Sequence, residues 1–210
     1  MGFAFAPRLP ARPGRSTSGL PDKNLHEHLM SPNLESQLQA LLDREAIREV
    51  MYAYCRGIDR GDEAALRLAY WEDATDRHGA YNGSASGFIE KALKSRSSGL
   101  RMIHQVSNIS IVLEGRQAAV ESYFQAFQYD TDPATGRLRE TFLCGRYADR
   151  FEKRGDEWRV AARTVIYDWL KEAPAPEGDE ATRFGVRAPQ GQMKPDDAWY
   201  ALLRQAPFAQ

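Results

Sequence analysis

The sequence carries one aspartate and one histidine whose settings suit acid–base chemistry. Asp59 ends a long amphipathic segment and lies between Gly57 and Gly61, and His104 opens an apolar stretch in the run MIHQVSN. An imidazole titrates near neutral pH, and a carboxylate bonded to it fixes its tautomer, so such a pair can act as a general base. Both residues also have inert interpretations: a solvated turn aspartate, and a histidine satisfied by the backbone.

A second group of candidates consists of residues that polarise or bind a substrate. Arg163 lies inside the apolar run VAARTVI, where an arginine is expected to face an interior and to pair with a carboxylate or an anionic ligand. An outward-facing arginine at a sheet edge is the alternative. Tyr54 lies on the last turns of the helical segment that leads to Asp59. Candidates for the lining of a binding pocket are His78, Tyr81, Arg146, Tyr167 and Trp169.

The sequence lacks the common motifs for cofactors and metals. It has no glycine-rich phosphate loop, no dinucleotide-binding fingerprint, no nucleophile elbow and no HExxH. Cys55 and Cys144 have neither metal-type spacing nor a disulfide framework, which favours a reducing, cytoplasmic setting. We therefore expect chemistry without a cofactor and without a metal.

The secondary-structure elements that must position these residues are helices in the first part of the chain and strands in the second. Helical spacing of apolar residues predicts a long helix over 34–59, with a break near Asp43 and Arg44, and shorter helices over 62–71 and 87–100. Alternation and turn residues then predict four antiparallel strands over 101–115, 116–131, 138–154 and 158–170. Asn82 and Gly83 are expected to form a turn. Helices followed by a meander predict an α+β fold with helices on one face of a bent sheet.

Composition limits the class of protein and of partner. The chain has 210 residues, a formal net charge of −1 and 42% hydrophobic residues, a balance typical of a globular protein with a core. This charge gives no reason to expect nucleic acid or a membrane as partner. We expect a loosely attached arm over 1–32, a single domain over 33–170, and a proline-containing extension over 171–210 that caps the pocket or an interface.

The order and spacing of four blocks resemble a known family. The blocks LLDREAIREVMYAYCRGIDRGD, YWEDATDRHGAYNG, MIHQVSNISI and CGRYADRFEKRGDEWRVAARTVIYDW look like the SnoaL-like branch of the nuclear transport factor 2-like superfamily. The resemblance covers about residues 36–169 and implies a cone: a curved, mostly antiparallel sheet wrapped by helices around a deep pocket. The branch includes hexachlorocyclohexane dehydrochlorinase, scytalone dehydratase and bile-acid 7α-dehydratase.

The resemblance also implies roles for particular residues. The family's catalytic aspartate and histidine fall on Asp59 and His104, and the strand arginine of the dehydrochlorinase falls on Arg163. Tyr54 matches the tyrosine of the bile-acid dehydratase rather than the lysine of the dehydrochlorinase. The set Tyr54, Asp59, His104 and Arg163 therefore looks most like the dehydratase version.

Three functions remain open on the sequence. The first is a cofactor-independent lyase that removes water, halide or a small carbonyl fragment from an aromatic or alicyclic molecule. The second is an isomerase or polyketide cyclase with the same dyad, and the third is a small-molecule-binding protein without catalysis, because fold alone does not fix activity. A broad sheet face further suggests a homodimer or homotrimer.

Overall fold

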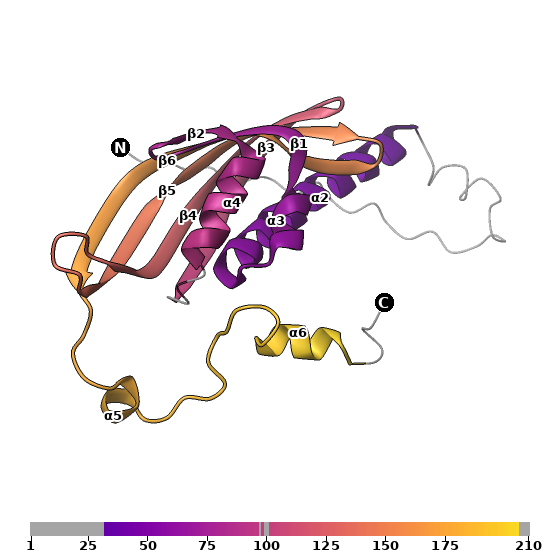
Figure 1. Ribbon diagram of the computed structural model, residues 1–210. Coiled ribbons are helices and arrows are strands. Elements are labelled where there is room, and N and C mark those ends of the chain that lie inside the picture. The colour runs from indigo at the N-terminus through magenta and orange to yellow at the C-terminus, as the bar shows by residue number, and fades with distance from the viewer. Residues whose placement is uncertain (1–31, 97, 99–100, 206–210) are drawn as a thin grey trace, which may run out of the picture. The chain divides into compact units, whose positions relative to one another are not determined.

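The computed structural model describes residues 32–205 except 97, 99 and 100, and it divides into two units, residues 1–39 and 40–210. Of the first unit, the described residues are the opening turns of a helix, where Gln37 donates a hydrogen bond to Asn33. The elements are α2 Pro32–Arg60, α3 Glu63–Ala69, β1 Tyr70–His78, β2 Tyr81–Ser84, α4 Ala85–Arg96, β3 Met102–Glu114, β4 Gln117–Thr131, β5 Leu138–Arg154, β6 Glu157–Pro174, α5 Glu180–Phe184 and α6 Ala198–Leu203 (Figure 1). The expected arm over 1–32 lies almost wholly outside the described residues.

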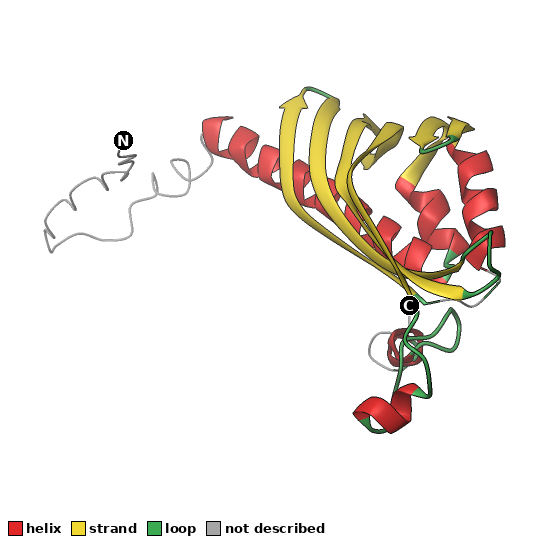
Figure 2. Cartoon of the chain, turned by 90° about the vertical axis from the view of Figure 1, so that its left-hand side faces the viewer, coloured by secondary structure: helices red, strands yellow, loops and turns green. Residues whose placement is uncertain are grey.

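The second unit is built on one sheet of six strands in the order β2-β1-β6-β5-β4-β3. All neighbouring strands are antiparallel except β1 and β6, which pair in parallel. The sheet curves strongly, and the helices α3 and α4 lie against its inner side (Figure 2). The predicted α+β class, with helices on one face of a bent sheet, is confirmed.

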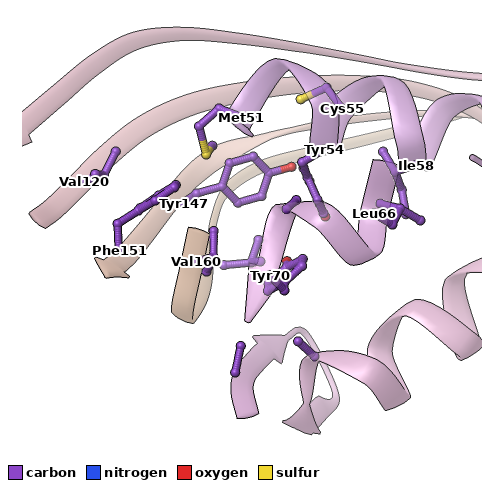
Figure 3. Packing of buried hydrophobic residues seen from close by; sticks show 14 of the residues in the cluster. Met51, Tyr54, Cys55, Ile58, Leu66, Tyr70, Val120, Tyr147, Phe151 and Val160 are labelled. Atoms are coloured by element: carbon purple, nitrogen blue, oxygen red, sulfur yellow. The ribbon is translucent and has the colours of Figure 1, made fainter. Parts of the chain in front are cut away.

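The core fills the space between the inner face of the sheet and the helices. Buried residues of α2 recur at helical spacing, as Ile47, Met51, Tyr54, Cys55 and Ile58, and therefore form one stripe. Along β4 and β5 buried residues alternate with more exposed ones, as expected for strands with one covered face. Figure 3 shows this helix stripe packed against aromatic side chains that come from the strands.

Three details of the expected fold were wrong. The predicted meander of four antiparallel strands is present as β3–β6, but the sheet has two further strands, because the segment after α3 pairs in parallel with β6 and then folds back on itself. The turn of that hairpin is at Gly79 and Ala80, and Asn82 and Gly83 lie inside β2. Gly79 has a φ of 58°, a left-handed conformation that glycine adopts at little cost.

The third detail concerns the helix α2, which is continuous through Asp43 and Arg44. The apolar stripe shifts there because polar side chains bind the sheet at this level. Asp43 accepts hydrogen bonds from the indole of Trp158 and from Lys153, both at 2.8 Å. Arg44 donates to the backbone carbonyl of Ile111 at 2.6 Å. The change of pattern thus marks a polar contact and not a break.

Candidate functional site

Asp59 and His104 form a hydrogen-bonded pair at one end of the fold. The carboxylate oxygen Oδ1 of Asp59 lies 2.7 Å from the imidazole Nδ1 of His104. The second oxygen, Oδ2, accepts the backbone N–H of the same histidine at 2.9 Å. Both carboxylate oxygens of Asp59 thus bind the same residue, His104, and the side chains of Asp59 and His104 are largely buried. Bound in this way, Nδ1 carries the proton and Nε2 is left as the basic nitrogen.

The sequence around Asp59 explains how a carboxylate comes to lie at the end of a helix. Helix α2 ends at Arg60, and the next residue, Gly61, has a φ of 61°, the left-handed conformation that terminates helices. A carboxylate at this end opposes the helix dipole. The guanidinium of Arg96 lies close by and donates to the backbone carbonyl of Asp59 at 3.1 Å, which satisfies one terminal carbonyl and supplies positive charge.

Asp59 lines a cavity of about 1110 Å³. Its described lining combines aromatic and aliphatic residues with four basic and three acidic side chains: Asp59, Arg60, Arg96, Arg101, Met102, Ile103, Phe127, Gln128, Tyr129, Glu140, Thr141, Phe142, Trp169, Lys171, Ala173, Gly191, Gln192, Met193 and Asp197. His104 is not among these residues, but it is hydrogen-bonded to Asp59, which is. Of the residues predicted from sequence, the cavity therefore unites Asp59 and Trp169.

Arg163 and Tyr54 lie deeper, in the core. As its apolar setting predicted, the Arg163 side chain faces the interior and pairs with a carboxylate: Nε and Nη2 donate to Asp149 at 2.9 and 2.7 Å. Its guanidinium lies 4.1 Å from the ring centre of Tyr54 and 4.3 Å from that of Tyr147. Burial raises the pKa of the Tyr54 hydroxyl, which therefore keeps its proton. Neither residue lines the described cavity, so their catalytic roles stay predictions.

The other candidates fall in two places. His78 and Tyr81 pack around Phe88, with the His78 ring stacked on it at 4.4 Å. Tyr167 contacts His78 edge-on at 6.2 Å. Arg146 lies among the outward residues of β5, where it binds Asp168 and Glu121. The structure thus separates these four residues from the lining of the cavity that holds Asp59.

Most of the cavity lining was missed by sequence reasoning. Met102 and Gln128 are recoverable in principle, because strand alternation places them on the face of His104. Arg60 follows Asp59 directly, but a basic residue at the end of a helix carries no signal for a cavity. Met193 and Gln192 come from the extension after β6, whose sequence has no periodicity that predicts where it packs.

A model of the SnoaL-like domain matches residues 39–164. The chain belongs to the SnoaL-like family. The matched region contains Asp59 and His104 and ends within β6, so the extension lies outside it. None of the curated proteins is a significant match to the sequence.

Solved structures with the same fold include two kinds of enzyme. A type 2 hexachlorocyclohexane dehydrochlorinase has 15% identity and a TM-score of 0.59, covering 68% of this chain and 97% of its own. The type 3 enzyme from Novosphingobium barchaimii has 15% identity and a TM-score of 0.57, with coverage of 68% and 98%. A scytalone dehydratase candidate from Novosphingobium aromaticivorans has 19% identity and a TM-score of 0.55, with coverage of 67% and 97%. At these identities the likeness establishes the nuclear transport factor 2-like cone fold and is silent on the reaction.

Two further observations concern metal binding and membrane-spanning helices. In the described part of the chain, no three histidine, cysteine, aspartate or glutamate side chains gather in a way that could hold a metal ion. Within the same part, every helix is too short or too polar to cross a membrane.

Proposed function

We propose that the chain is a cofactor-independent lyase that acts on an aromatic or alicyclic molecule by acid–base elimination. The observation that carries this proposal is the Asp59–His104 pair, in which both oxygens of one carboxylate bind one histidine beside a large cavity. Membership of a family whose fold is shared by dehydrochlorinases and a dehydratase candidate supports it.

In the proposed reaction, His104 takes a proton from carbon or from a hydroxyl through Nε2. Asp59 accepts the hydrogen bond from Nδ1 and stabilises the imidazolium that forms. When the proton comes from carbon, the C–H electron pair forms a C=C double bond and expels halide, or a hydroxyl group that leaves as water after protonation. When the proton comes from a hydroxyl of an aryl diol, the O–H electron pair forms the carbonyl of a released fragment such as formaldehyde. The electron pair of the broken C–C bond then takes up the proton from the His104 imidazolium, or forms a C=C double bond and expels the second hydroxyl as water after protonation. A base placed in this way typically contributes about 10²–10⁴-fold to the rate.

A mass-spectrometric screen tests the proposal. Purified protein is incubated with aromatic diols, hydroxysteroids and halogenated rings, and a His104→Gln variant serves as the blank. A product lighter by water, hydrogen halide or formaldehyde, formed by the wild type and absent from the blank, supports a lyase. A product of unchanged mass supports the isomerase or cyclase alternative, and binding without any product supports a non-enzymatic binding protein.

A further inference from the structure

Part of the extension after β6 forms a wall of the cavity. Residues 191–197, called the C-terminal strap below, contribute Gly191, Gln192, Met193 and Asp197 to its lining. The strap lies outside the region that the family model matches, which ends at residue 164. This wall is therefore an addition of this chain to the matched cone, next to the pair Asp59 and His104.

Asp62 fixes the strap to the end of α2. Its Oδ1 accepts a hydrogen bond from Lys194 Nζ at 2.8 Å, and its Oδ2 accepts one from the hydroxyl of Tyr200 at 3.0 Å. The backbone N–H of Lys194 also donates to the carbonyl of Arg60 at 2.9 Å. Asp62 is itself the N-cap of α3, where it accepts from Ala65 N–H. One buried carboxylate thus joins the strap to the loop that follows Asp59.

Met193 is the strap residue most closely connected to Asp59. The guanidinium Nη2 of Arg96 contacts both the sulfur of Met193, at 3.3 Å, and the backbone carbonyl of Asp59. A Cβ added to Gly61 would lie only 2.6 Å from Cε of Met193. The terminal methyl group of Met193 therefore occupies a space that exists because the residue after the helix is glycine.

The size and chemistry of the cavity indicate the kind of ligand that this wall encloses. A volume of about 1110 Å³ is at the upper end of ligand pockets, which run to roughly 1,000 Å³. Large apolar side chains face the same space: Met102, Phe127, Phe142, Trp169 and Met193. Of the basic residues, Arg60 pairs with Asp197 and Arg101 pairs with Glu180, which leaves less of their charge for an anionic ligand.

We propose that the C-terminal strap makes the cavity selective for multi-ring apolar molecules, with Met193 as the contact residue and Asp62 as the residue that positions the strap. This inference deepens the proposed function, since it names the substrate class of the same site. Rigid rings packed between methionine and aromatic side chains gain apolar burial at little cost in conformational entropy.

Equilibrium dialysis with estradiol, which has four fused rings, and with catechol, which has one, tests the proposal. The wild type is expected to bind estradiol more tightly than catechol. Met193→Trp narrows the cavity and is expected to weaken estradiol binding by about tenfold or more, while catechol binding changes by less than about twofold. Val186→Trp is the matched control, because Val186 lies in the same extension, is 87% exposed and does not line the cavity.

Asp62→Asn is the second variant and keeps the test valid if Met193→Trp fails to fold. Asparagine caps a helix as well as aspartate does, but it loses the ion pair with Lys194. We expect faster hydrogen exchange over residues 191–200 and weaker estradiol binding, with unchanged circular dichroism.

The proposal is overturned if the wild type binds neither probe, or if the Met193 and Asp62 variants bind estradiol like the wild type. Its failure is distinct from failure of the proposed function. Turnover that depends on His104 but is insensitive to Met193→Trp would support the proposed lyase activity and contradict the proposed role of the strap. Estradiol binding that depends on Met193, with no turnover of any compound screened, would support the proposed role of the strap and contradict the proposed lyase activity.

Discussion

At the scale of single residues, the Asp59 carboxylate binds His104 twice, once through the imidazole and once through the backbone. The two residues are 45 positions apart, and a helix end and a strand start bring them together. From the sequence, each residue was a candidate because of its type and setting, and family resemblance joined them. No local pattern predicts the double contact, because it depends on how α2 lies across β3.

The double contact predicts which ring nitrogen carries the proton. Nitrogen NMR of the neutral protein should show His104 protonated on Nδ1 and unprotonated on Nε2. In Asp59→Asn this tautomer is expected to lose its dominance, because a neutral amide holds Nδ1–H much less strongly than a carboxylate does. Asp156→Asn, in the turn between β5 and β6, is the control and should leave the His104 signals unchanged. A wild-type His104 protonated on Nε2 would contradict the geometry.

Arg163 shows what sequence reasoning could reach and what it could not. Its apolar neighbours predicted an interior side chain with a carboxylate partner, and the pairing with Asp149 confirms that part. The partner's identity follows from sheet register, since Asp149 and Arg163 are opposite each other on β5 and β6. That register is a tertiary property that the residues around Arg163 do not encode.

Removing one partner of this buried pair should destabilise the fold strongly. Asp149→Asn removes the carboxylate that Arg163 binds directly in the core, and such losses typically cost about 3–5 kcal/mol. Urea denaturation followed by circular dichroism measures the change. Asp168→Asn removes a carboxylate from Arg146 on the exposed side of β5 and should have a far smaller effect. Equal losses in the two variants would argue against a structural role for the Arg163 pair.

At the scale of elements, the meander was predictable because glycines mark its turns. Gly115, Gly136 and Gly155 all have left-handed φ values and lie between the long strands. The parallel pairing of β1 with β6 was not predictable in the same way, because it joins segments far apart in the chain. The short β2 was missed because Asn82 and Gly83 resemble turn residues.

Gly145 lies at one of the two places where β5 and β6 change register. The register shifts between Cys144 and Gly145, and a Cβ at Gly145 would lie 2.0 Å from the carbonyl oxygen of Ile166. Gly145→Ala should therefore lower stability by roughly 1–3 kcal/mol, the usual cost of overpacking. Gly191→Ala is the control, since a Cβ there meets nothing within 4 Å. Thermal melting curves compare the two, and a Gly145→Ala variant as stable as wild type would contradict the close approach.

The attachment of the strap should weaken in acid. Burial by itself raises the pKa of Asp62, but hydrogen bonds from Lys194, Ala65 and Tyr200 outweigh it and hold the pKa below its usual value. A lowered carboxylate pKa gives stability that is present above the unfolded-state pKa, about 3.9, and is lost as pH falls through the folded-state value. Hydrogen exchange over residues 191–200 should therefore differ between wild type and Asp62→Asn at pH 7.

At low pH the same comparison supplies the check. Once Asp62 is protonated, wild type and Asp62→Asn should exchange at similar rates, after correction for the intrinsic pH dependence of exchange. A difference that persists undiminished at pH 2 would contradict the assigned role of the Asp62 charge.

At the scale of the whole molecule, the outward face of the sheet is exposed and partly apolar. Val112 and Tyr123 are each more than 40% exposed, on β3 and β4, and neither lines the cavity. We expect this face to pair with a second copy of the chain, giving a dimer or trimer, because large exposed apolar patches mark interaction sites. Sedimentation velocity should show an oligomer that Val112→Glu with Tyr123→Glu dissociates. A wild type that sediments as a monomer at micromolar concentration would contradict this.

In the proposed reaction, His104, held by Asp59, is the base. The most direct test is kcat/KM of His104→Gln against wild type on a substrate from the screen, with circular dichroism as evidence of folding. Glutamine keeps a polar side chain of similar reach but cannot take up a proton. We expect a loss of about 10²-fold or more in kcat/KM. A folded variant whose kcat/KM stays within about tenfold of wild type would contradict it.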